Sequence, residues 1–269
     1  MSDFQDRVVL ITGASAGIGA ALAREFGRKG AKLILLARRI DRLKELATEI
    51  DPTGDRVLTF ACDVTKEEDL ETAVNFARQH FGKIDMTIAN AGWSLKGDLQ
   101  ELKVSDYERL WNTNVFGVLR TIYATLDALK QSRGKLAIVG SVKSYIALAG
   151  DSPYSMSKFA LRALCESLSQ ELAADGVSVI HICPGYVATE IRQIDNRGIW
   201  DEDSLDPISP RLMMSADEAA KQIIHAIDRG QKELVMSNYG KLVVWLKCYT
   251  PWLISWLISI FKIKVKSRL

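Results

Sequence analysis

Two side chains able to exchange protons, Tyr154 and Lys158, stand four residues apart in the sequence. This spacing places both of them on one face of a helix. A tyrosine with its ordinary pKa of about 10 is a poor acid–base group at neutral pH, but an ammonium group one turn away favours the phenolate. The pair therefore predicts a general acid–base catalyst with a lowered tyrosine pKa, the alternative being an ordinary surface pair. Ser141 ends the apolar run before this helix, and ligands of open α/β sheets bind at such strand ends.

A glycine turn near the start of the sequence is the element expected to hold a cofactor beside these residues. Val8–Thr12 is an apolar run typical of a strand buried on both faces of a parallel sheet. Gly13, Gly17 and Gly19 follow it, and an apolar-periodic helix begins around Ile18. Glycine is needed where the backbone turns tightly and approaches a pyrophosphate, and a helix N-terminus offers free N–H groups to the phosphates. Strand, turn and helix in this order predict a dinucleotide-binding element rather than only a tight connection.

The second expected strand ends in two arginines. Ala31–Ala37 is again a buried apolar run, and Arg38 and Arg39 follow it directly, where dinucleotide folds contact the adenosine ribose. An acidic residue at this point selects the 2′-hydroxyl of NAD, whereas an arginine accommodates the 2′-phosphate of NADP. The nearest acid, Asp41, belongs to the next helix. Because guanidinium groups pair bidentately with phosphate, the sequence predicts NADP(H), the alternative being that both arginines are solvated surface charges.

Strand-type and helical patterns alternate along the rest of the chain. Further strands are expected at 56–62, 84–89, 135–140, 177–183 and 233–236, and helices at 41–50, from 65 onward, and at 105–130, 152–174 and 215–228. The helical pattern of 105–130 is broken at Asn112–Asn114. Thr65 is expected to cap its helix in a capping box with Glu68, and Ser152 to cap the helix of Tyr154. The alternation predicts an α/β fold, a Rossmann-type doubly wound parallel sheet of about seven strands with helices on both faces. We expect it to be a single domain over residues 1–240, followed by a tail over 241–269.

Six short motifs stand in a fixed order along the chain. They are Thr12-Gly13-x-x-x-Gly17-x-Gly19, Asn90-Ala91-Gly92, Asn114, Ser141, Tyr154-x-x-x-Lys158 and Pro184-Gly185. In order and approximate spacing this set resembles the short-chain dehydrogenases/reductases, over about Arg7 to Met236. The resemblance implies that Tyr154 is the general acid of carbonyl reduction and the base of the reverse reaction. Lys158 would hold the nicotinamide ribose and lower the tyrosine pKa, Ser141 would hydrogen-bond the substrate oxygen, and Asn114 would organise a water that connects Lys158 to solvent.

The resemblance also assigns residues to the cofactor. Asp63 and Val64 would contact the adenine, Asn90 to Gly92 would support the adenosine side, and Thr189 would lie near the nicotinamide carboxamide. The full expected set is Gly13, Ser15, Gly17, Ile18, Gly19, Arg38, Arg39, Asp63, Val64, Asn90, Ala91, Gly92, Tyr154, Lys158, Pro184, Gly185, Val187 and Thr189. Members of this family usually form dimers or tetramers through their two longest helices, so a homodimer or homotetramer is implied.

Composition bears on the partners, metal sites and location to be expected of the protein. The formal net charge of +2 with 25% charged residues gives no reason to expect a nucleic-acid partner. The four cysteines and three histidines have no metal-ligand spacing, so we expect no metal site, and we expect three of the four cysteines to be reduced core residues. The first residues contain no apolar segment typical of a secretory signal, which favours a cytoplasmic protein.

The last part of the chain is much more apolar than the rest. Leu242–Phe261 contains three tryptophans, and a lysine and a proline interrupt it, whereas a membrane-spanning helix needs about 20 predominantly apolar residues. Four basic residues follow it: Lys262, Lys264, Lys266 and Arg268. Tryptophans beside a basic end are typical of a segment that lies on an anionic membrane surface. We therefore expect a peripheral membrane contact, the alternative being a subunit contact that covers the substrate pocket.

Bulky side chains follow the strand ends and motifs at which a substrate pocket is expected. They are Trp93, Tyr145, Ile146, Leu148 and Tyr186, with Ile191, Ile199 and Trp200 in the long connection 190–214. Connections of that length are usually lids or binding loops. Unless these are ordinary core residues, they favour a hydrophobic ketone or secondary alcohol as the substrate of an NADP(H)-dependent oxidoreductase. The alternatives are an epimerase or dehydratase of the wider superfamily, whose chains are usually longer, and a redox-sensing NADP-binding protein without turnover.

Overall fold

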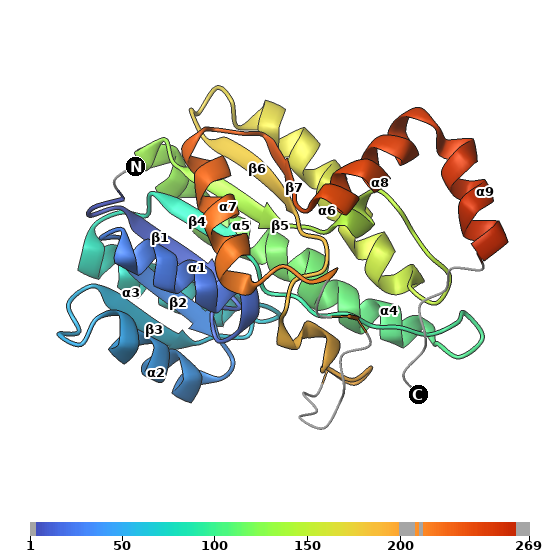
Figure 1. The fold of residues 1–269 in the computed structure, drawn as a ribbon. Helices are drawn as coiled ribbons and strands as arrows, with labels where there is room; N and C mark the ends of the chain where they lie inside the picture. Colours follow the sequence, from blue (N-terminus) through green and yellow to red (C-terminus); the bar gives the residue numbers. More distant parts are fainter. Residues whose placement is uncertain (1–3, 199–207, 210–211, 262–269) are drawn as a thin grey trace.

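Seven parallel strands form one sheet at the centre of the computed structural model, which describes residues 4–198, 208–209 and 212–261 (Figure 1). The strands are Val8–Thr12 (β1), Lys32–Ala37 (β2), Val57–Ala61 (β3), Met86–Ala89 (β4), Lys135–Val139 (β5), Ser178–Cys183 (β6) and Glu233–Val235 (β7). Their order across the sheet is β3-β2-β1-β4-β5-β6-β7. The predicted doubly wound α/β fold is confirmed.

Helices cover both faces of this sheet (Figure 1). The α-helices are Gly17–Arg28 (α1), Ile40–Ile50 (α2), Glu67–Phe81 (α3), Val104–Trp111 (α4), Gly117–Ser132 (α5), Ser152–Glu171 (α6), Ala216–Asp228 (α7), Asn238–Tyr249 (α8) and Pro251–Phe261 (α9). A π-helical turn, Asn112–Phe116 (η1), joins α4 to α5, and short 3₁₀ turns lie at Val142–Ser144 (η2) and Glu190–Arg192 (η3). The break expected inside the long helix is therefore confirmed as η1.

The continuous apolar runs of the strands are explained by two cores, one on each face of the sheet. In β1, Val9 and Ile11 pack with α1, α2 and α7, whereas Val8 and Leu10 pack with α3, α5 and α6. Every residue of β1 is buried. A strand that is buried on both faces has no polar face, which is why its sequence does not alternate.

The strand order places a crevice beside the glycine turn. The chain runs outward from β1 to β2 and β3, then returns to β4 on the other side of β1. In open α/β sheets, ligands bind outside the carboxyl ends of the strands at such a reversal. The turns that follow β1, β2, β4, β5 and β6 all reach this edge of the sheet, so they determine the site.

Two of the predicted helix caps are wrong. Lys66 is the N-cap of α3, and the Thr65 hydroxyl instead donates to Asp63 Oδ1 at 2.8 Å, which closes a local turn before the helix. Asp151 is the N-cap of α6, and the Ser152 hydroxyl lies 2.6 Å from the phenol oxygen of Tyr107 on α4. In both cases the hydroxyl group hydrogen-bonds another side chain instead of the N–H groups at the start of the helix.

Two helices follow β7. α8 and α9 meet at a bend of 116° and extend away from the sheet, at the right of Figure 1. Within the described part of the chain, no single helix is long and apolar enough to span a membrane, and α8 and α9 meet that length and composition only when taken together.

Candidate active site

Tyr154, Lys158 and Ser141 meet at the carboxyl end of β5. Tyr154 and Lys158 lie in the first two turns of α6, and Lys158 Nζ is 5.5 Å from the centre of the Tyr154 ring. Lys158 is only 5% exposed, and its Nζ donates to the Val139 carbonyl at 2.9 Å. Ser141 follows β5 after Gly140, and its side chain hydrogen-bonds that of Tyr154. The helical spacing and the strand end thus bring these three side chains together.

The pKa values of this pair are set mainly by burial. Burial raises the pKa of Tyr154 above its ordinary value, and the Asp151 carboxylate raises it further, against smaller lowering effects from Ser141 and Arg192. The expected lowering of the Tyr154 pKa is therefore wrong for this structure. Burial lowers the pKa of Lys158 to about 8, because desolvation disfavours the ammonium form. A tyrosine that keeps its proton at neutral pH is suited to donate that proton.

Asn114 links α6 to the segment that follows β4. It is fully buried in η1, where its Oδ1 accepts from the Trp93 N–H at 3.0 Å. Its Nδ2 donates to the Trp93 carbonyl at 2.9 Å and to Ser157 Oγ at 3.2 Å. A Cβ atom at Gly92 would lie 3.1 Å from Asn114 Oδ1 and 3.8 Å from Lys158 Nζ, so these groups share one small space. The expected role of Asn114 in organising a water stays a prediction.

The glycine turn fits a phosphate-bearing ligand. Gly13 has a φ of +66°, and a Cβ there would lie 2.9 Å from Ala91 Cα. A Cβ at Gly19 would collide with the Gly13 carbonyl oxygen. Gly17 has a φ of +55° and faces the side chain of Thr189. Only glycine keeps this backbone open to a pyrophosphate at the N-terminus of α1, so the cradle suits the predicted dinucleotide.

Thr12 is a site residue that the expected set did not contain. Its Oγ1 accepts from the N–H groups of Asn90 at 3.0 Å and Ala91 at 3.1 Å. Asn90 Nδ2 donates in return to the Thr12 carbonyl at 2.9 Å. These bonds fix the end of β4 against the end of β1. The signal in the sequence was a buried threonine as the last residue of an apolar strand.

The two arginines after β2 have different surroundings. Arg38 is exposed, and its charge acts on the nearby Asp63 carboxylate. Arg39 donates from Nε to Ser15 Oγ at 3.3 Å and from Nη1 to Glu190 Oε2 at 2.9 Å. Arg42, from the first turn of α2, donates to Glu190 Oε1 at 2.6 Å. Neither Arg42 nor Glu190 was expected here, because 148 residues separate them in the chain.

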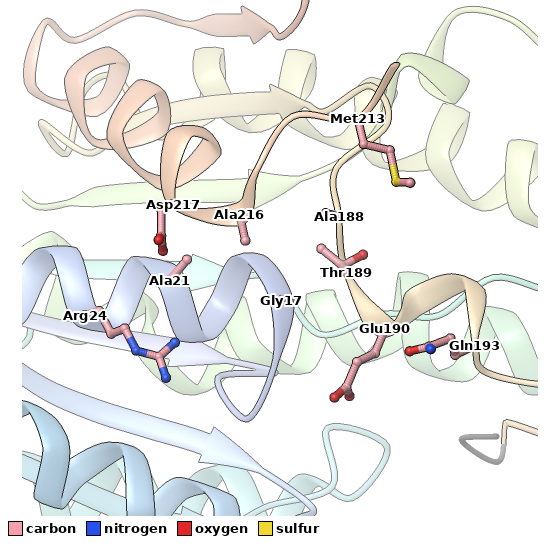
Figure 2. A pocket seen from close by; sticks show the side chains of 10 residues that line it. All are labelled: Gly17, Ala21, Arg24, Ala188, Thr189, Glu190, Gln193, Met213, Ala216 and Asp217. Atoms are coloured by element: carbon pink, nitrogen blue, oxygen red, sulfur yellow. The ribbon is translucent and has the colours of Figure 1, made fainter. Parts of the chain in front are cut away.

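The segment after β6 covers the glycine turn. Thr189 packs against Gly17, and Val187 forms an isolated parallel bridge with Met214. A pocket of about 410 Å³ lies between this segment and the first turns of α1 and α7. Figure 2 shows Thr189 and Glu190 on one side of this pocket, with Ala21 and Arg24 of α1 on another.

Pro184 and Gly185 are held by the elements on either side of them. The Pro184 carbonyl accepts from the Val142 N–H at 2.9 Å, which ties the ends of β5 and β6 together. The Tyr239 hydroxyl accepts from the Tyr186 N–H and packs against Gly185, and the two tyrosine rings stack at 5.7 Å. The first turn of α8 therefore contacts the strand end that carries Pro184 and Gly185, which both belong to the expected cofactor-binding set.

Only some of the bulky residues expected in the substrate pocket lie near Tyr154. Trp93 packs in one small cluster with Leu95 and Leu110, and Tyr154 and Ile194 lie against that cluster. Tyr145 instead lies under α6, where its hydroxyl donates to Glu233 of β7 and the Arg162 guanidinium stacks on its ring at 4.1 Å. Tyr145 is thus a core residue that contacts α6 and β7. Of the other expected residues, Ile199 and Trp200 lie outside the described residues, as do the basic residues after Phe261.

One group of metal-ligating side chains gathers that the sequence spacing did not indicate, and the expectation of no metal site stays a prediction. His181 and Glu233 are direct neighbours in the β6–β7 register, and Cys183 follows on the same face. Their ligand atoms lie within 4.8 Å of one another. His181 Nδ1 is 3.3 Å from both Glu233 Oε1 and Cys183 Sγ. Strand pairing, which joins residues 52 positions apart, explains why the sequence spacing did not show this group.

Comparison with known proteins agrees with this geometry. The family model for short chain dehydrogenase matches residues 7–199. The chain belongs to this family. A relative named 11-beta-hydroxysteroid dehydrogenase 1A, from Arabidopsis thaliana, is 33% identical over 258 residues, which cover 93% of this chain and 74% of the relative. An uncharacterized oxidoreductase of Listeria monocytogenes is 32% identical over 84% of this chain and 92% of its own.

Solved structures show the same fold. An alcohol dehydrogenase from the archaeon Thermococcus sibiricus, complexed with 5-hydroxy-NADP, is 30% identical with a TM-score of 0.75, over 86% of this chain and 95% of its own. A short chain dehydrogenase/reductase from Burkholderia phymatum, in complex with NAD, has a TM-score of 0.83 over 94% and 97% of the two chains. At 22% identity the latter shows the fold alone. This chain is therefore a nucleotide-binding oxidoreductase of the short-chain dehydrogenase family.

Proposed function

We propose that this chain interconverts an apolar ketone and its secondary alcohol with NADP(H). The observation that carries this proposal is the convergence of Tyr154, Ser141 and Lys158 beside the glycine turn. A bound nicotinamide supplies the hydride in reduction and accepts it in oxidation. Ser141 holds the carbonyl oxygen, and Tyr154 delivers its phenolic proton to that oxygen as the alcohol forms. Lys158 holds the nicotinamide ribose, and its buried Nζ is within one helical turn of Tyr154.

The proposed NADP(H) preference is supported by three guanidinium groups after β2. Arg38, Arg39 and Arg42 follow the strand end that faces the adenosine ribose, and two of them already bind a carboxylate. The archaeal alcohol dehydrogenase was solved with 5-hydroxy-NADP. A dissociation constant at least about tenfold lower for NADPH than for NADH is expected, since charge-assisted pairs contribute roughly 1.5–3 kcal/mol. Equal constants for the two cofactors would contradict the preference.

An apolar substrate is supported by Trp93 beside Tyr154 and by the relatives named hydroxysteroid dehydrogenases. The test is a panel of ketones, including steroids and long-chain aliphatic ketones, with NADPH consumption followed by absorbance. Tyr154→Phe is the control for non-enzymatic reaction. Tight NADPH binding without turnover of any ketone or alcohol would favour a redox sensor instead.

The proposed homodimer or homotetramer is supported by exposed apolar side chains along η1, α5 and α6. Phe116, Tyr123, Met156 and Phe159 are all more than a third exposed. A groove of about 860 Å³ runs between Phe116, Met156 and Trp111. Light scattering should give a multiple of the 29.9 kDa chain mass, and Tyr123→Glu should reduce it. A monomer at micromolar concentration would contradict this proposal.

The proposed membrane contact is supported by α8 and α9. Trp245, Trp252 and Trp256 are each more than half exposed. From residue 234 onward the sequence has six basic and no acidic residues, which leaves residues 1–233 with a net charge of −4 out of the chain's +2. Two such tails would repel each other, whereas an anionic lipid surface attracts each of them. We therefore propose a cytoplasmic enzyme that binds membranes reversibly.

Flotation with anionic liposomes tests this contact. The full chain should float at low salt and be released at high salt, and the double variant Trp252→Ser/Trp256→Ser should not float. Leu99→Ser is the matched control, because Leu99 is more exposed than either tryptophan but lies before α4, outside α8 and α9. A full chain that stays unbound at low salt would favour a subunit contact for this tail.

A further inference from the structure

Glu190 connects the two halves of the dinucleotide crevice. It begins η3, directly after Thr189 in the segment that follows β6. Its carboxylate reaches the end of β2 and the start of α2, where Arg39 Nη1 donates to Oε2 at 2.9 Å and Arg42 Nη1 donates to Oε1 at 2.6 Å. Figure 2 shows the Glu190 side chain extending from this segment past the start of α1. One carboxylate therefore pairs with two guanidinium groups that follow β2, which lies on the other side of β1 from β6 in the strand order.

The same two guanidinium groups lie where a cofactor phosphate is expected. Arg39 also donates to Ser15 Oγ of the glycine turn at 3.3 Å, which places its guanidinium beside the path of the dinucleotide. Paired oxygens between two arginines are a common arrangement for both carboxylate and phosphate, because both anions offer coplanar acceptors to the guanidinium fork. Although burial raises the pKa of Glu190, the hydrogen bonds from Arg42 and Arg39 outweigh it and keep the carboxyl group ionised. Glu190 thus presents an anion to the arginines at neutral pH.

We propose that Glu190 is a cofactor-selecting residue: its carboxylate competes with the 2′-phosphate of NADP(H) for Arg39 and Arg42. This inference rests on the proposed NADP(H) function and adds Arg42 to the 2′-phosphate site. NAD(H) has no 2′-phosphate, so it leaves the Glu190 pairs intact. NADP(H) replaces them, and the segment from Thr189 to Gln193 loses its tie to α2 in the same step. The arginines alone would favour NADP(H) more strongly than the complete protein does.

Direct binding measurements separate this competition from other roles of Glu190. Dissociation constants are measured by calorimetry for NADPH and NADH on the wild type, Glu190→Gln and Arg42→Ala. Glu190→Gln should bind NADPH about tenfold more tightly at low ionic strength, because no carboxylate then competes with the 2′-phosphate for Arg39 and Arg42. Its NADH constant should stay within about twofold, since that ligand does not displace the carboxylate. Arg42→Ala should weaken NADPH binding alone.

Dissociation constants for adenosine 2′,5′-bisphosphate and for 5′-AMP test the 2′-phosphate site alone, because neither ligand carries a nicotinamide. The advantage of the bisphosphate over 5′-AMP should grow in Glu190→Gln by the same factor as the advantage of NADPH over NADH. Glu49→Gln is the matched control, because it removes another arginine-paired carboxylate, bound to Arg24 at 2.8 Å, with the same change in net charge. Melting temperatures of all variants show whether the fold is kept.

Each result has a distinct meaning. Weaker binding of both cofactors to Glu190→Gln would show that the ion pairs clamp any dinucleotide, which overturns the competition. Unchanged constants for both cofactors would overturn it as well. If the wild type prefers NADH or binds neither cofactor, the proposed function itself fails, and this inference fails with it.

Discussion

Replacing Lys158 by methionine should stabilise the protein while it removes activity. Lys158 is 5% exposed, and burial lowers its pKa from 10.5 to about 8. Below pH 8 the folded protein therefore holds a buried ammonium that the unfolded chain would keep in water, at a cost of roughly 3 kcal/mol. Methionine has a similar length and no charge to bury. It also loses the hydrogen bond from Nζ to the Val139 carbonyl, worth about 1–2 kcal/mol.

The expected net gain at pH 7 is about 1–2 kcal/mol, which corresponds to a rise in melting temperature of about 2–6 °C for a chain of this size. The stability difference between the methionine variant and the wild type should depend on pH. The folded wild type releases the Lys158 proton near pH 8 and the unfolded chain only near 10.5, so wild-type stability rises between these values and the methionine variant loses its advantage.

Urea unfolding of both proteins from pH 6.5 to 9.5 measures this difference directly. Lys221→Met, on the exposed side of α7, is the matched control and should change stability by less than about 0.5 kcal/mol. A methionine variant that is less stable than the wild type at pH 7, with a difference independent of pH, would refute the reasoning. In that case Lys158 would be held as a structural cation.

Three further substitutions test the site. Tyr154→Phe should lower kcat at least about a hundredfold, as expected for loss of a general acid, and leave the NADPH dissociation constant within about twofold; more than a tenth of wild-type activity would contradict the mechanism. Arg38→Asp should invert the preference between NADPH and NADH in calorimetry, because a carboxylate repels the 2′-phosphate and accepts from the 2′-hydroxyl. Gly13→Ala should cost about 1–3 kcal/mol in urea unfolding and weaken both cofactors equally, because of its φ of +66° and its contact with Ala91.

Local patterns in the sequence were sufficient for most of the fold. The apolar run Val8–Thr12, the glycines after it and the break at Asn112–Asn114 each depend on neighbours within a few residues, and the structure has them as β1, the turn and η1. Local structure also determines which residues can occur there: a strand buried on both faces requires apolar residues, and a positive φ favours glycine. The chain order of strands and helices then sets the topology, because parallel crossovers have a fixed hand.

The features that could not be predicted depend on long-range packing. The Glu190 pairs span 151 and 148 residues, and the His181–Glu233 contact depends on the register of β7 beside β6. The pKa of Tyr154 depends on burial and on Asp151, neither of which follows from its spacing to Lys158. Thr65 failed as a cap because Asp63 was a nearer partner, which a sequence rule for caps does not weigh.

The two pKa directions at the site together predict how the reaction depends on pH. Burial keeps the proton on Tyr154 across the physiological range, so the general acid needed for carbonyl reduction is present there. Lys158 loses its charge as the pH rises through about 8, and with it the cation that faces the Tyr154 ring. We therefore expect kcat/KM for ketone reduction to be constant below pH 7 and to fall above about 8, whereas alcohol oxidation, which needs the phenolate, should rise with pH. Reduction that increases between pH 7 and 9 would show that a group other than Lys158 governs the alkaline limb.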